Sequence, residues 1–274
     1  MIRTSGAGPH HDGVTRKTFA LVLVAVLAAG GLVASSSHRG AAAGTVRRSV
    51  VLDVLFVGNS LIGTPAATGE DTPDLLRHLA RASGRSVRTT KVIRFGQTLQ
   101  RTWDAGAARR ALTGSARYDF ILLQEYSTLV AGDPARATAT LLRTYAPALA
   151  RSLKPGGRVV LFKNWALADP APFTSRARNV AALDAGYARL AAALPLPTLI
   201  APISDAFETV VARYGTGTLL VPDGKHPADR AVYLDAAVLY GLFFGCSPRD
   251  LPDLHVPPAA AARLRGAAAT ALGY

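Results

Sequence analysis

Long apolar segments alternate with helical patterns along the chain, and this alternation restricts the possible folds more than any other feature. Residues 50–57 read VVLDVLFV, which is typical of a strand buried on both faces of a parallel sheet. Similar segments predict further strands at residues 86–93, 118–124, 158–163 and 198–203. Helical patterns fall at residues 71–82, 134–153, 175–193, 228–244 and within 257–271. This order predicts an α/β fold with a doubly wound, mostly parallel five-stranded sheet and helices on both of its faces.

The first 44 residues have the pattern of a targeting segment. Arg16 and Lys17 precede an uncharged, apolar stretch over residues 18–34, and small residues follow it. This order is typical of a secretory signal peptide. The alternative is an uncleaved membrane anchor, because the apolar stretch is only slightly short for a spanning helix. We therefore expect one globular domain over residues 45–274 that is secreted, or held outside the membrane by the N-terminal segment.

Composition excludes several classes of protein. The chain has 274 residues and is 49% hydrophobic, which is enough for one sizeable core. Cys246 is the only cysteine, so no intramolecular disulfide and no cysteine-based zinc site can form. The formal net charge is +13, but no basic-aromatic tract or DNA-binding motif is present. We expect no nucleic-acid partner, and the oligomeric state is not predicted.

A Gly-Asn-Ser loop, residues 58–60, follows the first predicted strand directly. Gly58 and Gly63 have the spacing of a phosphate-binding loop, but Thr64 stands where that loop needs a lysine. The remaining interpretations are a serine nucleophile at Ser60 or an ordinary turn or helix cap. The first of these requires a base and an orienting carboxylate elsewhere in the chain.

Asp223 and His226 lie three residues apart, in a predicted loop that leads into a helix. A serine hydroxyl needs an imidazole to accept its proton, and the imidazole needs an acceptor that holds its tautomer. This loop could supply both groups to Ser60. The alternative is that Asp223 belongs to a plain turn and that His226 is a surface or cap residue.

The order of these motifs resembles that of the SGNH (GDSL-like) hydrolases. Gly58-Asn59-Ser60 stands where that family commonly has Gly-Asp-Ser, and Asp223 and His226 match its last block. The resemblance spans residues 52–245 in block order. It implies a three-layer α/β/α fold, the cleavage of esters by Ser60, His226 and Asp223, and no requirement for a metal or another cofactor.

The resemblance also implies an oxyanion hole. The backbone amides of Ser60 and Gly96 would contribute two donors. The family's third donor is an Asn side chain, and this chain has Gln124 at that place. We therefore expect the Gln124 amide to take that role. Glu125 follows it, and we expect its carboxylate to point away from Ser60 or to pair with an arginine such as Arg94.

Asn164 and Trp165 follow the fourth predicted strand, at the sheet edge that carries Ser60. We expect them to line the substrate pocket, because a Trp ring can stack on a sugar. A core position for Trp165 under a loop is the alternative.

Two functions follow from these expectations. The first is a secreted serine esterase or deacylase that hydrolyses carboxylic (acetyl or acyl) esters of a small molecule or a carbohydrate. The second is a non-catalytic, secreted or surface-anchored module that keeps the fold and binds a glycan or another ligand. The joint presence of Ser60, Asp223 and His226 favours the first.

Overall fold

The computed structural model describes residues 51–274. The predicted targeting segment and the first residues of the predicted domain lie outside this range. Within residues 51–274, no helix combines the length and the apolar character that crossing a membrane would require.

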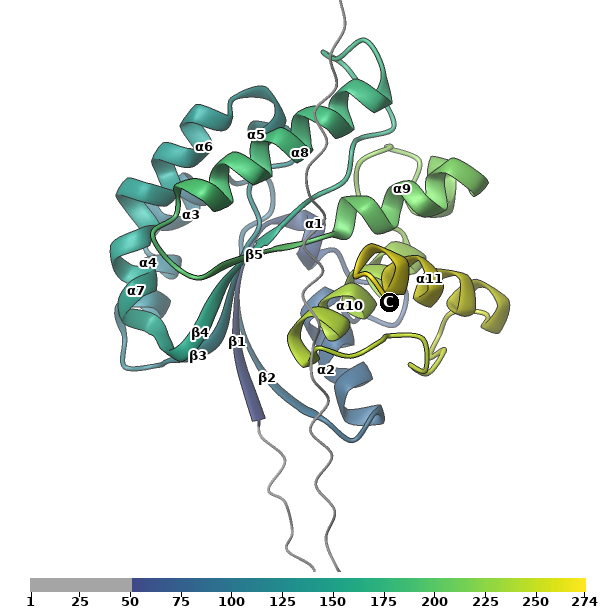
Figure 1. Cartoon of the computed structure of the whole chain (residues 1–274), viewed down its shortest axis with the longest axis horizontal. Helices are drawn as coiled ribbons and strands as arrows, with labels where there is room; N and C mark the ends of the chain where they lie inside the picture. The colour runs from purple at the N-terminus through teal and green to yellow at the C-terminus, as the bar shows by residue number, and fades with distance from the viewer. Residues whose placement is uncertain (1–50) are drawn as a thin grey trace, which may run out of the picture. The chain divides into compact units, whose positions relative to one another are not determined.

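A parallel five-stranded sheet forms the middle layer of the molecule (Figure 1). Its order is β2-β1-β3-β4-β5, and every neighbouring pair is parallel. The strands are β1 (Val51–Gly58), β2 (Ser86–Ile93), β3 (Tyr118–Leu123), β4 (Leu153–Phe162) and β5 (Thr198–Ala201). The α/β fold with a parallel five-stranded sheet is therefore confirmed.

Each face of the sheet is covered by its own set of helices (Figure 1). Successive side chains of a strand point to opposite faces, so Val54 and Phe56 pack into one core and Leu55 and Val57 into the other. The first core is closed by α2 (Thr72–Ala82), α9 (Ile203–Tyr214), α10 (Asp229–Phe244) and α11 (Pro258–Ala271). The second is closed by α3 (Leu99–Asp104), α4 (Ala107–Thr113), α6 (Pro134–Thr140), α7 (Ala146–Ser152) and α8 (Arg176–Ala193). Both faces of the sheet are thus buried.

The helices differ from the expected pattern in two places. The helix expected over residues 134–153 is divided into α6, a π-helical turn over Leu141–Tyr145, and α7. The short helices α3 and α4, and the longer α9, were not evident from the sequence pattern. The helices α3 and α4, of 6 and 7 residues, contain too few residues to show a clear period. This reason does not apply to α9, which has 12 residues.

The strand order reverses between β1 and β3, because the chain adds β2 on one side of β1 and continues with β3 on the other. In open parallel sheets, ligands bind at such a switch point, outside the carboxyl ends of the strands. Two short helices follow the two strands there: α1 (Ser60–Gly63) after β1, and α5 (Leu129–Gly132) after β3. This is the edge at which the candidate residues gather.

Candidate active site

Asn59 fixes the turn that presents Ser60. Its backbone is extended (φ −133°), and its side-chain oxygen accepts a hydrogen bond from the Leu61 amide at 3.2 Å, so it is the N-cap of α1. Its side-chain nitrogen donates to the Gln97 carbonyl at 3.1 Å. One asparagine therefore starts the helix that carries Ser60 and attaches the loop after β2 to it. The sequence suggested a cap in this loop, but the capping residue is Asn59.

A second loop brings Asp223 and His226 to Ser60. One carboxylate oxygen of Asp223 accepts hydrogen bonds from the Lys225 and His226 amides, at 2.8 and 2.9 Å. These bonds close a tight turn, in which Gly224 adopts a φ of +67°. A Cβ atom on Gly224 would lie 2.8 Å from the Ala168 Cβ. This position therefore favours glycine for both its conformation and its packing.

The Ser60, His226 and Asp223 side chains form a continuous hydrogen-bonded series. The His226 Nε2 lies 2.9 Å from the Ser60 Oγ, and the His226 Nδ1 lies 2.6 Å from the second Asp223 oxygen. With the Nδ1 proton donated to Asp223, Nε2 is free to accept the serine proton. The bond from His226 lowers the pKa of Asp223 to about 2, and the amides of the turn act in the same direction. The carboxylate is therefore charged at neutral pH.

Two backbone amides near Ser60 have no hydrogen-bond partner within residues 51–274. They belong to Ser60, the first residue of α1, and to Gly96, in the loop after β2. Gly96 is exposed and has a φ of +71°, which favours glycine. Both amides were expected as oxyanion donors, and the structure leaves both free to donate.

Gln124 occupies a different position from the one expected. Its side chain is fully buried. Its Oε1 accepts from the Asn59 amide at 2.8 Å, and its Nε2 donates to the Glu125 carbonyl. A Cβ atom on Gly58 would lie 2.8 Å from the Gln124 Oε1, so the amide lies under the Gly-Asn-Ser loop. Gln124 therefore supports that loop from below instead of facing a substrate.

The hydrogen-bond partners of Glu125 are backbone amides and not Arg94, the arginine suggested from the sequence. One carboxylate oxygen accepts from the Leu99 and Tyr126 amides, at 3.0 and 2.6 Å. Burial raises the pKa of Glu125, and these two hydrogen bonds oppose that shift. Glu125 thus connects the end of β3 to the start of α3.

Asn164 and Trp165 were expected to line the substrate pocket, but the structure places both side chains in the interior, which is the alternative considered for Trp165. Both are 0% exposed. The Asn164 amide nitrogen donates to the Ser127 carbonyl at 2.9 Å, and its oxygen accepts from the Tyr187 hydroxyl. The Trp165 ring stacks on Phe207, with centroids 4.2 Å apart. The sequence could not tell inward from outward side chains after a strand.

Trp165 nevertheless contributes to the site through its indole nitrogen, which donates to the Lys225 carbonyl at 3.1 Å. The Ala168 amide donates to the neighbouring Gly224 carbonyl at 2.8 Å. The segment after β4 therefore holds the Asp223–His226 turn against the core. As for metals, the described residues contain no group of three His, Cys, Asp or Glu side chains placed to hold an ion.

The sequence matches no protein-family model and no curated protein. The fold is similar to that of a DUF4886 family protein from Bacteroides uniformis, with a TM-score of 0.69 and 17% identity over 82% of this chain and 96% of that one. A protein assigned as an SGNH hydrolase, from Slackia heliotrinireducens, matches with a TM-score of 0.53 and 23% identity over 70% of this chain and 98% of that one. An acetylxylan esterase from Geobacillus stearothermophilus matches with a TM-score of 0.52 and 15% identity over 72% of this chain and 95% of that one. The chain therefore has the three-layer α/β/α fold of the SGNH hydrolases.

Proposed function

We propose that this protein is a serine ester hydrolase that works by acyl transfer. The observation that carries the proposal is the continuous series from Ser60 Oγ through His226 to Asp223, with spacings of 2.9 and 2.6 Å. A serine becomes a nucleophile when an oriented imidazole can take its proton. The fold shared with an acetylxylan esterase and with a lipase/acylhydrolase from Enterococcus faecalis supports the same reaction class.

The reaction proceeds in two halves. The Ser60 oxygen attacks the ester carbonyl while its proton moves to His226 Nε2, and the carbonyl electron pair moves onto the oxygen. When the intermediate collapses, the alcohol leaves with the proton from His226, and the acyl group stays on Ser60. A water molecule then gives its proton to His226 and attacks the acyl group. The acid is released as Ser60 takes the proton back.

The negative oxygen of the intermediate is stabilised by the free amides of Ser60 and Gly96. Removing one such donor from a working site typically lowers kcat by about 10²–10³. Gln124 contributes to this hole by holding Asn59, and through it the start of α1. Its direct donation to the oxyanion would require its side-chain nitrogen to leave the Glu125 carbonyl.

The substrate class we propose is a carboxylic ester of a carbohydrate or another small molecule. We also propose that the protein acts outside the cytoplasm, on the basis of the pattern over residues 1–44. N-terminal sequencing of the protein recovered from culture medium tests this localisation. A mature chain that begins near residue 44 supports export with cleavage. An intact chain in the cytoplasm would contradict it.

The second candidate, a non-catalytic binding module, is favoured by one observation. The side chain that stands at the family's third oxyanion position is turned into the core. A module that only binds its ligand has no need of that donor.

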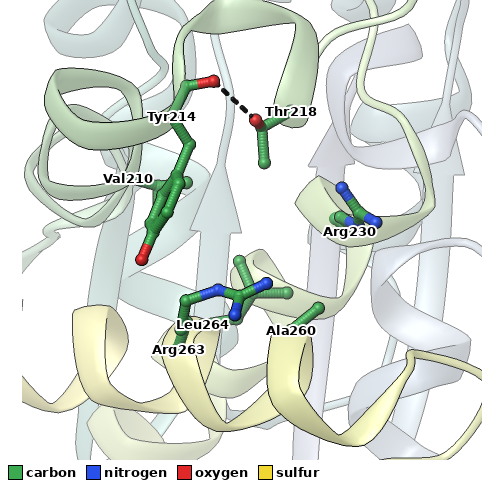
Figure 2. Close-up of a pocket in the computed structure, with 7 residues that line it drawn as sticks. All are labelled: Val210, Tyr214, Thr218, Arg230, Ala260, Arg263 and Leu264. Carbon is green, nitrogen blue, oxygen red and sulfur yellow. Dashed lines mark hydrogen bonds between the residues drawn. The ribbon is translucent and has the colours of Figure 1, made fainter.

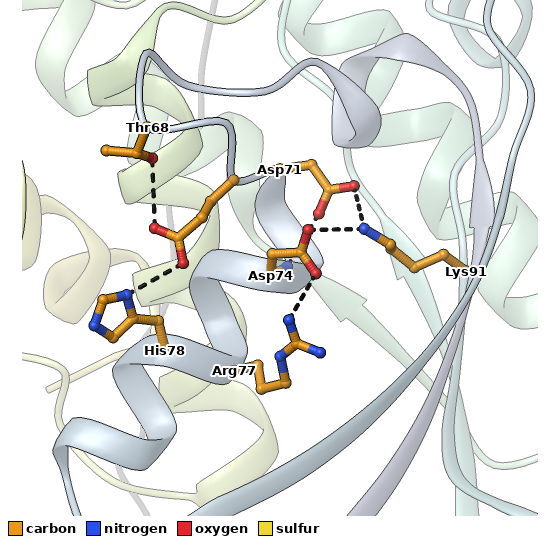
Figure 3. A network of polar contacts seen from close by, with 7 residues as sticks. Thr68, Asp71, Asp74, Arg77, His78 and Lys91 are labelled. Atoms are coloured by element: carbon orange, nitrogen blue, oxygen red, sulfur yellow. Dashed lines mark hydrogen bonds and ion pairs between the residues drawn. The ribbon is translucent and has the colours of Figure 1, made fainter.

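Fluorophosphonate labelling of the protein, located by peptide mass, separates the two candidates. We expect an adduct on Ser60 that is lost in His226→Ala. His78→Ala is the matched control, because His78 lies on α2 within a separate polar network and pairs with Glu70 at 3.2 Å (Figure 3). The control should label like the wild type. A well-folded protein without an adduct would refute the hydrolase and leave the binding module.

A further inference from the structure

A cavity of about 260 Å³ opens beside the candidate oxyanion hole. Gly96, whose amide is free, forms part of its lining, together with Arg101, Tyr126, Thr128, Leu129 and Arg136. One water molecule occupies about 30 Å³ in the liquid, so the cavity has room for a substituent of several heavy atoms. A substrate held at Ser60 could place part of its structure there.

The cavity contains two cations and no carboxylate. Arg101 comes from α3 and Arg136 from α6, and both are exposed. Neither forms an ion pair with a carboxylate among the residues that the structure describes. The Asp104 carboxylate accepts a hydrogen bond from the Gln100 side chain, and the Asp133 carboxylate accepts one from the Arg136 backbone amide. Glu125 is buried and bonded to backbone amides, and the positive charge of Arg136 opposes the rise in its pKa without forming an ion pair. The two guanidinium groups are therefore available to a ligand.

A third cation extends this charge to the catalytic loop. The Lys225 Nζ lies 4.9 Å from the centre of the Tyr126 ring and 3.4 Å from its hydroxyl. Lys225 precedes His226, and Tyr126 lines the cavity. Tyr126 thus contacts both the cavity and the residue that precedes the histidine, so a third positive charge lies at this wall of the cavity.

A second basic cavity lies between α9, α10 and α11 (Figure 2), and it lacks the features that make the cavity beside Gly96 a candidate for substrate binding. Its lining includes Arg230 and Arg263, but its volume is only about 70 Å³. Arg263 already stacks over the ring of Tyr214, 5.2 Å from its centre. None of the proposed catalytic or oxyanion residues lines it. Of these two cavities, the one lined by Gly96 combines greater space, available arginines and a proposed oxyanion donor.

We propose that the ester substrate carries a second, anionic group, a carboxylate or a sulfate, that binds Arg101 and Arg136 in this cavity. The inference rests on the proposed function and specifies its substrate class. Guanidinium groups bind planar oxyanions through paired hydrogen bonds. Binding of this remote group would position the ester carbonyl between Ser60 and the Gly96 amide.

The test compares three esters with the same acetyl group: 4-acetoxybenzoate, 4-acetoxyphenyl sulfate and the neutral methyl 4-acetoxybenzoate. The measured quantity is the ratio of kcat/KM for each anionic ester to that for the neutral one. Replacing both arginines (Arg101→Gln with Arg136→Gln) should lower this ratio by about 10², because charge-assisted hydrogen bonds are each worth about tenfold or more. Arg81→Gln with Arg151→Gln, at two exposed arginines on α2 and α7, is the control with an equal charge change. It should keep the wild-type ratio.

The two anionic esters show which oxyanion the cavity prefers. The inference is overturned if the double variant has the wild-type ratio and still hydrolyses the neutral ester through Ser60. In that case the proposed function remains supported.

Direct binding decides the inference if no ester is hydrolysed. Calorimetric titration of Ser60→Ala with 4-acetoxybenzoate should show binding that is lost when both arginines are also replaced. Such a result supports the anion site even when the hydrolase proposal has failed. No binding, or binding that the arginine replacements do not weaken, overturns it.

Discussion

Two groups of loops meet at the carboxyl edge of the sheet and use their polar side chains in opposite ways. The loops after β1 and before α10 direct Ser60 and His226 toward each other, 2.9 Å apart. The segments after β3 and β4 turn Gln124 and Asn164 into the interior, where each bonds the backbone of a neighbouring loop. One group supplies the groups that can react, and the other fixes where they stand. The geometry of the candidate site therefore depends on side chains that are buried beneath it.

The carboxylates at this edge show the same contrast. Asp223 has a side chain that is 47% exposed, and the hydrogen bond from His226 lowers its pKa to about 2. Glu125 is 3% exposed, and burial raises its pKa. A charged group that orients a histidine is thus kept near water, and a group that joins two backbone segments is kept inside.

The largest expected effect is on the exposed side of this comparison. Asp223→Asn should lower kcat by about 10³–10⁴, because the histidine loses the acceptor that holds its tautomer. Its melting temperature at neutral pH should fall only modestly, because the variant loses the charged bond to His226 at a side chain that is half exposed. Ester kinetics and thermal unfolding measure the two quantities, and Asp250→Asn, at an exposed site on another loop, is the control. A large loss of stability would show that Asp223 is a structural residue.

Trp165→Ala tests the buried side. Truncating a buried Trp typically costs about 3–5 kcal/mol of unfolding free energy, and here it also removes the bond to the Lys225 carbonyl. Trp165→Phe keeps an aromatic ring against Phe207, but it loses that hydrogen bond, worth about 1 kcal/mol, and part of the buried ring volume. It should therefore cost less than Trp165→Ala. Denaturant unfolding gives the stabilities. If Trp165→Phe lowers kcat by more than its loss of stability explains, the indole positions the His226 loop.

Gln124→Leu tests whether Gln124 supports the Gly-Asn-Ser loop or donates directly to the oxyanion. Leaving the Asn59 amide and the Glu125 carbonyl without partners should cost about 1–3 kcal/mol of unfolding free energy. A direct oxyanion donor would instead lose about 10²–10³ in kcat with little change in stability. Thermal unfolding and kcat, measured on the same preparation, decide between them. Unchanged stability would return Gln124 to the oxyanion hole.

The smallest expected effect is a change in how the stability of the protein depends on pH. Folding raises the pKa of Glu125 above its usual 4.5, so its favourable contribution is complete below that pH and is lost as pH rises through the folded value. Folding lowers the pKa of Asp223 from 3.8 to about 2, so its contribution is present above pH 3.8 and is lost as pH falls toward 2. The melting temperature of Glu125→Gln, relative to that of the wild type, should therefore rise as the pH rises. The melting temperature of Asp223→Asn, relative to that of the wild type, should rise as the pH falls. If the melting temperatures of both variants follow that of the wild type at every pH, the contrast between the Glu125 and Asp223 carboxylates is wrong.

The alternation of apolar segments was sufficient to predict the sheet and most of the larger helices, because burial on both faces leaves a direct mark on composition. The Gly-Asn-Ser and Asp-Gly-Lys-His loops were also recognisable, since turn residues and functional groups are adjacent in the sequence. The inward direction of Gln124 and Trp165 was not predictable. It depends on partners 65 and 60 residues away, Asn59 and Lys225, and no local pattern records such pairs.

The cavity beside the candidate site has a consequence for engineering. Its two arginines stand on α3 and α6, whereas Ser60 and His226 stand on the loops after β1 and before α10. The proposed anion-binding residues and the proposed reacting groups therefore lie in separate stretches of the chain. A library that varies only positions 101 and 136 can explore new specificities, from anionic through neutral to cationic esters, without a change to the reacting groups.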